Sequence, residues 1–341
     1  MAAPAPPLSS ESSLSCIASG ANIPAPGGEV RLASRGPALA RPLIEFLAAR
    51  AIPGLEEAEG GSFRRNLAGG GWLELRPAPD PEARWLDLRL HRAGTGPAGS
   101  SGGTGTSAND DDVVRIVRRV ADLDTDLAPV SAHLASDPEL AERLAAVGPA
   151  RLPGTFDPFE LAVRAVAGQQ VTVAAARTLL GRLVALVATG GEAGPADVVV
   201  VPAFPTAAAV AEAPLDGLGM PASRRASIRE LARAVADGRV ALDPDADPDQ
   251  LTRQLVALPG IGPWTAGYVT MRVVAHGDGW PAGDLVLRQS LGLPAADLER
   301  RAQAWRPWRS YAALLLWRTA PPPLPRTRKS TAPRPDGTPR P

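Results

Sequence analysis

The sequence predicts an α+β amino-terminal domain, an antiparallel sheet plus a helix, followed by a mostly all-α domain. Between residues 29 and 92, one helical repeat of apolar residues precedes short segments in which apolar and polar residues alternate. Between residues 113 and 320 only helical periods occur, separated by proline and glycine. A Gly/Ser-rich stretch at 93–112 lies between the two regions and is predicted to be a flexible linker.

In the small α+β domain at 29–92, the segment 39–51 has apolar residues at helical spacing and ends before Pro53-Gly54. Three short segments follow, at 62–68, 71–77 and 84–92. The last two alternate in hydropathy, which predicts strands of an antiparallel sheet with one wet face. We assign Trp72 and Trp85 to the core of this sheet.

Helix start signals are repeated through residues 113–320. An aspartate followed by proline is typical of an N-cap and first helical position, and such pairs occur at Asp137-Pro138, Asp157-Pro158 and Asp247-Pro248. Thr172 is predicted to cap another helix after an interruption at 168–170. Amphipathic helices are also expected at 113–123 and 228–235, the latter ended by Gly238.

The composition excludes several classes of protein. The chain has 341 residues and a single cysteine, Cys16, so a disulfide framework, a four-thiolate iron–sulfur cluster and a cysteine-rich zinc site are excluded. No apolar run is long enough to cross a membrane, and the first basic residue is Arg31, so no secretory signal is expected. We therefore expect a cytoplasmic, monomeric protein without a membrane partner.

Charge alone gives little indication of a partner. Residues 1–112 carry −3 (10 Arg against 13 acids), and residues 113–341 carry +3 (25 Arg and one Lys against 23 acids). This asymmetry is too weak to predict nucleic-acid binding. Residues 1–27 and the proline-rich tail at 321–341 have almost no large apolar residues and are predicted to be disordered.

The segment 247–275 is the most informative. A helix is followed by the turn 258–262 (LPGIG), and Pro263 begins a second helix. The two glycines, Gly260 and Gly262, leave amides uncovered at a helix N-terminus, which favours a phosphate oxygen. From this pattern alone, a tight helix–helix turn without a ligand is the more frequent explanation.

Further motifs extend the pattern in a fixed order. They are AVRAVAGQQVTVAAA (162–176), LGMPASRRASI (218–228), GDLVLRQ (283–289) and RPWRSYAALLLWR (306–318). Together with LPGIG, these motifs resemble the bacterial inducible 3-methyladenine DNA glycosylases of the AlkA type, which belong to the helix-hairpin-helix DNA glycosylase superfamily. The resemblance covers about 29–320 and implies that 113–320 is a helix-hairpin-helix glycosylase domain. It further implies excision of 3-methyladenine and related N-alkylpurines from duplex DNA in base excision repair.

The resemblance implies a role for Asp284, which stands 22 residues (284 − 262) after Gly262. A carboxylate at this position stabilises the oxocarbenium-like sugar and orients water as the N-glycosidic bond breaks. From the residues alone, Asp284 is an N-cap for a helix at 285–291, and the two roles are compatible.

By the same resemblance, Trp264, Tyr268 and Trp317 line the base pocket, where aromatic faces attract a cationic purine. By default such residues at helical spacing belong to a core. Relatives that also cleave the backbone have a lysine at the hairpin position of Trp264, whereas the single lysine here is Lys329. The resemblance therefore implies a monofunctional enzyme without a lyase step.

The resemblance also implies DNA contacts at Gly260, Ile261 and Gly262, and at Gln169 and Gln170. Gln170 stands where some relatives insert an apolar wedge into the duplex; a turn whose polar groups are satisfied locally is the alternative for both glutamines. No cofactor is expected to be required. A structural monovalent cation (Na or K) is implied on the backbone carbonyls of the hairpin, which here are those of Val256, Leu258 and Ile261.

Three other functions are compatible with these residues. One is a glycosylase for oxidised or deaminated bases, and another is a non-catalytic helix-hairpin-helix protein that recognises DNA structure. The third is an alkylation-response regulator, because in longer relatives a methyl-accepting cysteine domain precedes this unit. Since Cys16 lies in a segment predicted to be disordered, we expect no such activity here.

Overall fold

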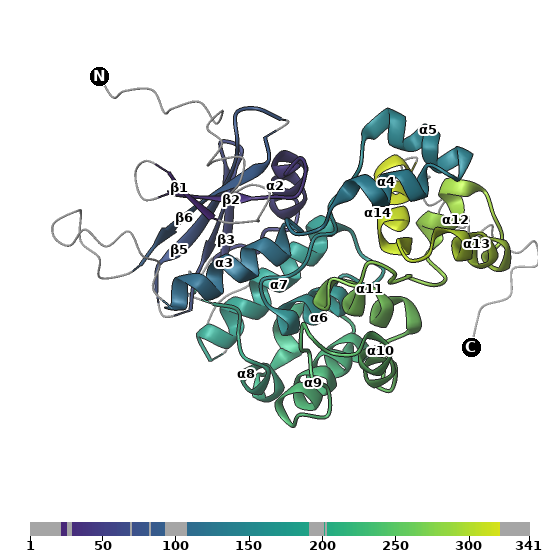
Figure 1. The fold of residues 1–341 in the computed structure, drawn as a ribbon. Coiled ribbons are helices and arrows are strands. Elements are labelled where there is room, and N and C mark those ends of the chain that lie inside the picture. The colour runs from purple at the N-terminus through teal and green to yellow at the C-terminus, as the bar shows by residue number, and fades with distance from the viewer. Residues whose placement is uncertain are drawn as a thin grey trace, which may run out of the picture.

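The computed structural model describes residues 22–25, 29–68, 70–81, 83–92, 108–190, 201 and 203–320. The first part of the chain forms a six-stranded antiparallel sheet with the strand order β1-β2-β6-β5-β4-β3. The strands are β1 (Asn22–Ala25), β2 (Glu29–Ala33), β3 (Glu56–Glu59), β4 (Ser62–Asn66), β5 (Trp72–Pro77) and β6 (Trp85–His91). Figure 1 shows this sheet at the amino-terminal end of the molecule.

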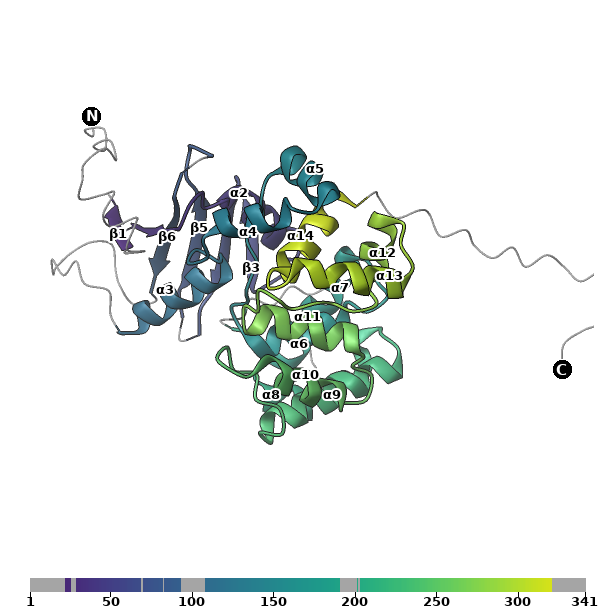
Figure 2. The same ribbon diagram turned by 45° about the vertical axis from the view of Figure 1, so that its right-hand side comes forward.

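Two helices cover the sheet. Helix α2 (Ala40–Ala48) follows β2, and α3 (Ala108–Val120) follows β6. Their apolar residues and alternate residues of the central strands, such as Leu75 and Leu88, form one buried core. Figure 2 shows both helices against the sheet. The predicted α+β amino-terminal domain with one wet face is therefore confirmed.

The other face of the sheet is polar, and it corrects the assignment of two tryptophans. Trp72 and Trp85 are only half-buried. Trp72 stacks on His91 at a centroid distance of 5.1 Å and lies under the Arg64 guanidinium, while Arg31 lies over Trp85. In each strand the neighbouring leucines occupy the core face, and because successive side chains alternate, the tryptophans must occupy the outer one.

The structure also moves two predicted boundaries. Residues 22–25, assigned to a disordered segment, form β1, which pairs with β2. Residues 108–112, assigned to the linker, begin α3, whose Val114, Val117 and Val120 are buried against the sheet. Apolar complementarity therefore places α3 with the sheet and not with the helical domain. The rest of 1–27, the linker at 93–107, Cys16 and the tail at 321–341 lie outside the described residues.

The remaining chain is helical, and after His91 the described residues contain no strand. Its helices are α4 (Leu127–Leu134), α5 (Pro138–Val147), α6 (Pro158–Ala167), α7 (Val173–Ala188), α8 (Ala207–Glu212), η2 (Leu215–Leu218), α9 (Ala222–Ala236), α10 (Pro248–Val256), α11 (Pro263–Val273), α12 (Leu285–Leu291), α13 (Ala295–Ala302), η3 (Gln303–Trp305) and α14 (Arg309–Thr319). Asp137, Asp157, Thr172 and Asp247 each cap the predicted helix through a side-chain oxygen. No helix in these ranges is long and apolar enough to span a membrane.

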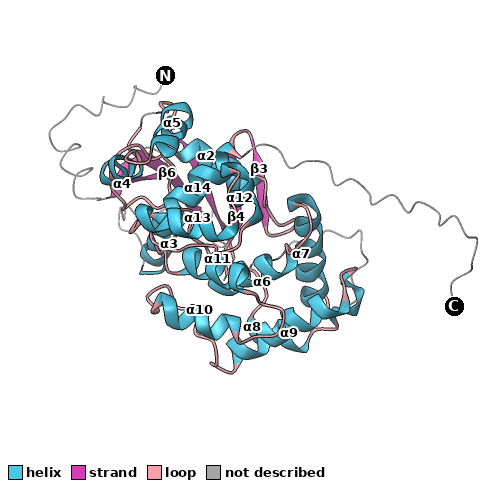
Figure 3. Ribbon diagram, turned by 90° about the vertical axis from the view of Figure 1, so that its right-hand side faces the viewer, coloured by secondary structure: helices cyan, strands magenta, loops and turns pink. Residues whose placement is uncertain are grey.

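The helices form two bundles with separate cores. One core contains α6 to α11. The other combines α4 and α5 with α12, α13 and α14, so the chain leaves this second bundle and returns to it. Helix α11 contributes to both cores, through Val269 to the first and Met271 to the second. Figure 3 shows α11 between the two bundles.

A buried cluster of four charges joins the sheet to α6. Arg65 on β4 contacts the carboxylates of Glu56 on β3 and Glu160 on α6, and Arg164 on α6 contacts the same two carboxylates. The Arg164 Nη2 to Glu56 Oε2 distance is 2.6 Å. Each charge faces two of opposite sign, which offsets the cost of removing all four from water.

Candidate active site

The predicted hairpin is formed by α10 and α11. Proline begins α11, and its N-cap, Gly262, has no side-chain cap. The amide of Ile261 is used within the turn, donating to the carbonyl of Leu258 at 3.2 Å. Ile261 itself is buried in the core of the first bundle, whereas Gly260 and Gly262 are exposed. Of the three predicted contact positions, Gly260 and Gly262 are therefore accessible, and Ile261 is not.

The two glycines of the turn are subject to different structural constraints. Gly260 has φ +81°, and a Cβ atom there would lie 1.9 Å from the hydroxyl oxygen of Ser227 on α9. At Gly262 φ is −84°, and a Cβ atom would meet nothing within 4 Å. Gly260 is therefore required by packing, while the space beside Gly262 is open to a ligand.

The glutamines at 169 and 170 occupy the turn between α6 and α7 and behave differently. The Gln169 side-chain amide donates to the carbonyl of Gly260 at 3.0 Å and to the hydroxyl of Thr265 at 3.1 Å. It therefore joins the α6–α7 turn to the hairpin, through partners that are 91 and 96 residues away in the sequence. Gln170 is exposed, with φ +58°.

Asp284 is the N-cap of α12 and is also in contact with the hairpin. Its Oδ1 accepts from the amide of Leu287 at 2.8 Å, and its Oδ2 accepts from the indole Nε1 of Trp264 at 2.6 Å. The residue is 6% exposed. The carboxylate is thus fixed between the two bundles, with each oxygen held by one N–H donor.

The three predicted aromatic residues lie together. The rings of Trp264 and Tyr268 stack with a centroid distance of 5.5 Å and an interplanar angle of 5°. Trp317 on α14 meets Tyr268 edge-on, at 6.3 Å and 64°. All three are half-buried. The structure therefore brings residues of α11, α12 and α14 to one place, as the resemblance implies.

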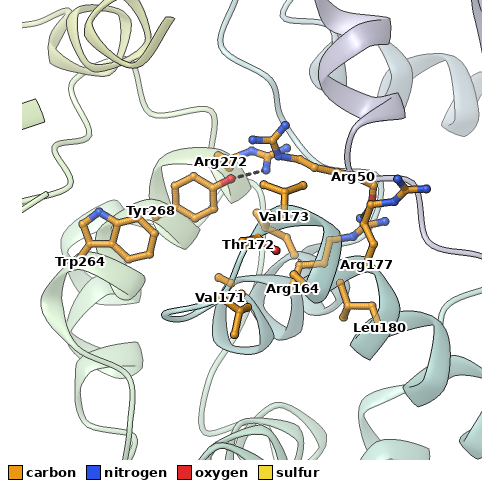
Figure 4. Close-up of a pocket in the computed structure, with 14 residues that line it drawn as sticks. Arg50, Arg164, Val171, Thr172, Val173, Arg177, Leu180, Trp264, Tyr268 and Arg272 are labelled. Atoms are coloured by element: carbon orange, nitrogen blue, oxygen red, sulfur yellow. Dashed lines mark hydrogen bonds between the residues drawn. The ribbon is translucent and has the colours of Figure 1, made fainter. Parts of the chain in front are cut away.

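A cavity of about 190 Å³ opens beside the aromatic stack. Trp264 and Tyr268 form one side, and the residues Val171, Thr172 and Val173 of the α6–α7 turn form the opposite side (Figure 4). Asp284 and Trp317 do not line this cavity. Asp284 is connected to it through the indole of Trp264.

Four arginines also line this cavity, and the sequence analysis did not find them. They are Arg50, Arg164, Arg177 and Arg272. Arg272 donates to the Tyr268 hydroxyl at 2.8 Å. Burial disfavours the Tyr268 phenolate, but the charges of Arg272, Arg50 and Arg164 outweigh this, so the pKa of Tyr268 is lowered.

For Arg272 the sequence contained a usable signal, because Tyr268 and Arg272 are four residues apart and therefore share one helix face. Arg50 had none: it follows α2 in the amino-terminal domain, and only the tertiary structure brings it to α11.

The groups predicted to hold a metal ion are backbone carbonyls. In the described part of the chain, no cluster of three or more His, Cys, Asp or Glu side chains could hold a metal ion. The last carbonyls of a helix such as α10 lack intrahelical partners, and a carbonyl oxygen has two lone pairs. Of the three carbonyls predicted to hold a monovalent cation, that of Val256 lies at the C-terminal end of α10, and that of Leu258 accepts from the amide of Ile261.

Comparisons with known proteins agree with this geometry. Residues 29–157 match the family model of the AlkA N-terminal domain. The fold is similar to that of a 3-methyladenine DNA glycosylase from Archaeoglobus fulgidus, with a TM-score of 0.63 and 17% identity over 84% of this chain and 96% of that one. The chain therefore has the fold of this DNA glycosylase.

Two relatives narrow this class to a family. The chain is 32% identical over 289 residues to DNA-3-methyladenine glycosylase 2 of Escherichia coli, covering 81% of this chain and 92% of the relative. It is 38% identical over 301 residues to a probable bifunctional transcriptional activator/DNA repair enzyme AlkA of Mycobacterium tuberculosis, covering 85% of this chain and 56% of that relative. The chain belongs to the AlkA family of DNA-3-methyladenine glycosylases, and it spans about half the length of the mycobacterial relative.

Proposed function

We propose that this protein is a monofunctional DNA glycosylase that flips alkylated bases, chiefly 3-methyladenine and related N-alkylpurines, out of duplex DNA and hydrolyses their N-glycosidic bond. The observation that carries the proposal is the position of Asp284. Its carboxylate is buried where the two bundles meet, is fixed by two N–H donors, and is joined through Trp264 to the aromatic stack.

The reaction needs one fixed negative charge. An alkylated purine is cationic and leaves as a neutral base, taking both electrons of the C1′–N bond. The sugar then becomes oxocarbenium-like, and the carboxylate of Asp284 stabilises this positive charge. Water adds to C1′ and loses its proton to solvent, so no protein group needs to form a covalent bond.

Base recognition is assigned to the aromatic residues. Unstacking the flipped nucleotide costs a few kcal/mol, and stacking on Trp264 and Tyr268 offsets part of this cost. A cation–π contact contributes about 1–2 kcal/mol in a desolvated site. The preference for cationic purines follows from these faces, and Trp317 meets Tyr268 edge-on.

DNA binding is assigned to the hairpin. A phosphate oxygen approaches the open side of Gly262 and accepts from the uncapped amides at the start of α11. A monovalent cation on the carbonyls of Val256, Leu258 and Ile261 would supply positive charge to the same phosphate. Since amides carry no net charge, this mode of phosphate binding is consistent with the formal net charge of zero of the chain.

The absence of a lyase step is part of the proposal. A lyase needs an amine that forms a Schiff base with C1′. The single lysine of the chain is Lys329, and the hairpin position occupied by lysine in lyases is here Trp264. We therefore expect that incubation with abasic-site DNA and borohydride traps no covalent complex.

The test compares wild-type protein with Asp284→Asn on methylated duplex DNA. We expect base release under single-turnover conditions to fall by about 10²–10³-fold, while binding to abasic-site DNA is retained. Asparagine preserves the size of the side chain, and a thermal melt checks that the variant is folded.

The outcomes separate the competing functions. Equal release by both proteins contradicts the role of Asp284. Binding without any release by wild-type protein indicates a non-catalytic hairpin protein. Release confined to oxidised or deaminated bases indicates the other class of glycosylase.

A further inference from the structure

A second hollow, here called the outer groove, begins at the α6–α7 turn. It has a volume of about 560 Å³ and is bounded by the turn, by α7 and by the start of α9. The residues of the groove that matter for its chemistry are Gln170, Val171, Arg182 and Arg224. The cavity beside the aromatic stack, described above, is called the base cavity.

The outer groove and the base cavity lie against opposite faces of α7. Thr178 and Arg182 line the groove, whereas Ala176 and Leu180 line the base cavity. The two pairs are offset by two positions, which corresponds to about 200° around a helix. Val171 lines both hollows. The α6–α7 turn therefore separates the two hollows.

Gln170 belongs to the outer groove alone. It lines the groove but not the base cavity, and it is exposed with φ +58°. A left-handed backbone is unfavourable for residues other than glycine, and such strain is concentrated at functional sites. The adjacent Gln169 donates to the carbonyl of Gly260 in the hairpin. The groove therefore begins beside the surface assigned to DNA.

The outer groove contains positive charge without a counter-charge. Among the ten described residues that line it, none is acidic. Within the described residues, Arg182 has no ion pair, and its Nε is buried without a hydrogen-bond partner. Arg224 Nη2 donates to the carbonyl of Gln169 at 2.5 Å, whereas the neighbouring Arg225 is paired with Asp216. Two guanidinium groups without a carboxylate suit an electron-rich ligand.

The groove also contains apolar surface. Leu179 and Met220 line it and are buried. A Cβ atom at Gly219, where φ is +69°, would lie 3.1 Å from Arg182 Nη1, so glycine leaves room for the guanidinium. A phosphate needs only the positive charge, whereas a nucleobase has apolar faces and a polar edge. The combination of groups therefore favours a nucleobase.

Flipping a nucleotide leaves the base on the other strand without a partner. The acceptors on its Watson–Crick edge then lack hydrogen bonds, which costs free energy wherever protein excludes water. Cytosine presents two adjacent acceptors, N3 and O2, and a guanidinium can donate two parallel hydrogen bonds to such a pair. An arginine beside the gap can therefore replace the lost base pair.

We propose that the outer groove is an orphan-base site, in which Arg182 donates to the undamaged-strand base whose partner has been flipped, while Gln170 occupies the gap. The two hollows then receive the two members of one broken base pair. Arg224 is a positioning residue, because it holds the turn through the carbonyl of Gln169. The inference rests on the function proposed above and adds a preference for cytosine opposite the lesion.

The experiment uses duplexes with a tetrahydrofuran abasic-site analogue placed opposite either cytosine or a second tetrahydrofuran. Neither duplex contains a damaged base, so the cost of flipping one does not affect the comparison. Fluorescence anisotropy gives dissociation constants for wild type, Arg182→Met, Arg182→Lys and Arg233→Met. Arg233 is exposed on α9 and does not line the outer groove, so it is the matched control.

We expect wild type to bind the cytosine duplex about tenfold more tightly than the doubly abasic duplex. Arg182→Met should abolish this difference. Arg182→Lys should recover part of it because it retains a charged donor, and Arg233→Met should leave it unchanged. Thermal melts identify any variant that fails to fold, and if Arg182→Met is unfolded, Arg182→Lys still tests the loss of the planar guanidinium.

Equal affinity of wild type for both duplexes overturns the inference, as does a difference that Arg182→Met leaves intact. Equal weakening of both duplexes by Arg182→Met also overturns it, because a contact with a backbone phosphate has this effect. Release of 7-methylguanine from duplex DNA is measured with the same wild-type preparation. Its absence contradicts the proposed function, whereas release without a preference for cytosine contradicts the orphan-base site alone.

Discussion

At the scale of single residues, the site depends on a carboxylate with two roles. Asp284 caps α12 through one oxygen and accepts from Trp264 through the other. The sequence alone favoured the cap, and the structure contains it. Because the second oxygen is bonded to a residue of the hairpin, the cap also fixes the position of the carboxylate relative to the aromatic stack.

The hydrogen bond from Trp264 can be tested separately from its ring. Trp264→Phe retains an aromatic face on Tyr268 but removes the indole N–H. Leaving a buried acceptor unpaired costs about 1–3 kcal/mol, and Asp284 loses one of its two positional restraints. We expect kcat for 3-methyladenine release to fall by about tenfold, with a smaller change in KM. An unchanged kcat would contradict a positioning role for the indole N–H.

At the scale of elements, the two glycines of the hairpin turn have different surroundings. Gly260 adopts a positive φ and abuts Ser227, whereas Gly262 is the exposed and uncapped start of α11. From the sequence motif alone, both glycines are expected to expose backbone amides in the same way. The structure assigns the first to the contact with α9 and leaves the second for a ligand.

Alanine substitutions at these glycines are expected to have different effects. Gly260→Ala introduces a steric clash and a positive φ, so the free energy of unfolding should fall by about 2–4 kcal/mol. Gly262→Ala should unfold like wild type, since φ −84° suits alanine. Its methyl group covers the open amides, however, so DNA affinity should fall by about tenfold.

Chemical denaturation and fluorescence anisotropy with abasic-site duplex measure the two quantities. Wild-type DNA affinity in Gly262→Ala would show that phosphate does not contact this side of the turn.

At the scale of the whole molecule, the amino-terminal domain forms part of the site. The buried cluster of Arg65, Glu56, Glu160 and Arg164 attaches the sheet to α6. Arg164 also lines the cavity and donates to the carbonyl of Arg50 at 2.6 Å. The position of Arg50 in the cavity is therefore coupled to the docking of the sheet on the helices.

The cluster predicts a pH dependence of stability. Burial raises the pKa of Glu160, but Arg65 and Arg164 outweigh this, and the pKa falls to about 2. Because the folded pKa lies below the unfolded value of about 4.3, the stabilisation is complete above the unfolded pKa and is lost as pH falls toward 2.

Glu160→Gln leaves the two arginines undercompensated and should lower the free energy of unfolding by about 3–5 kcal/mol at pH 7. The control is Asp112→Asn, which breaks the exposed pair with Arg115 and should change stability by less than about 0.5 kcal/mol. Urea titrations at pH 7 and pH 4 measure both variants. Equal effects of the two substitutions would show that the buried cluster contributes no more than a surface pair.

Local signals predicted much of this architecture. Aspartate and threonine caps marked the helix starts, and alternation marked the strands, because both depend on interactions within a few residues. The misassigned Trp72 and Trp85 show the limit of this reasoning. The alternation of apolar and polar residues indicates which residues share a face of a strand. Which of the two faces is buried is determined by the helices that cover the sheet.

The sequence by itself determined the two-part fold, the hairpin and the order of motifs around Asp284, since these depend on short-range caps, turns and spacing. Only the tertiary structure decided that α3 packs on the sheet, that Trp264 donates a hydrogen bond to Asp284, and that Arg50 and Arg272 line one cavity. The physical reason is that these contacts join residues far apart in the chain, and their geometry is set by the packing of whole bundles and not by any local pattern.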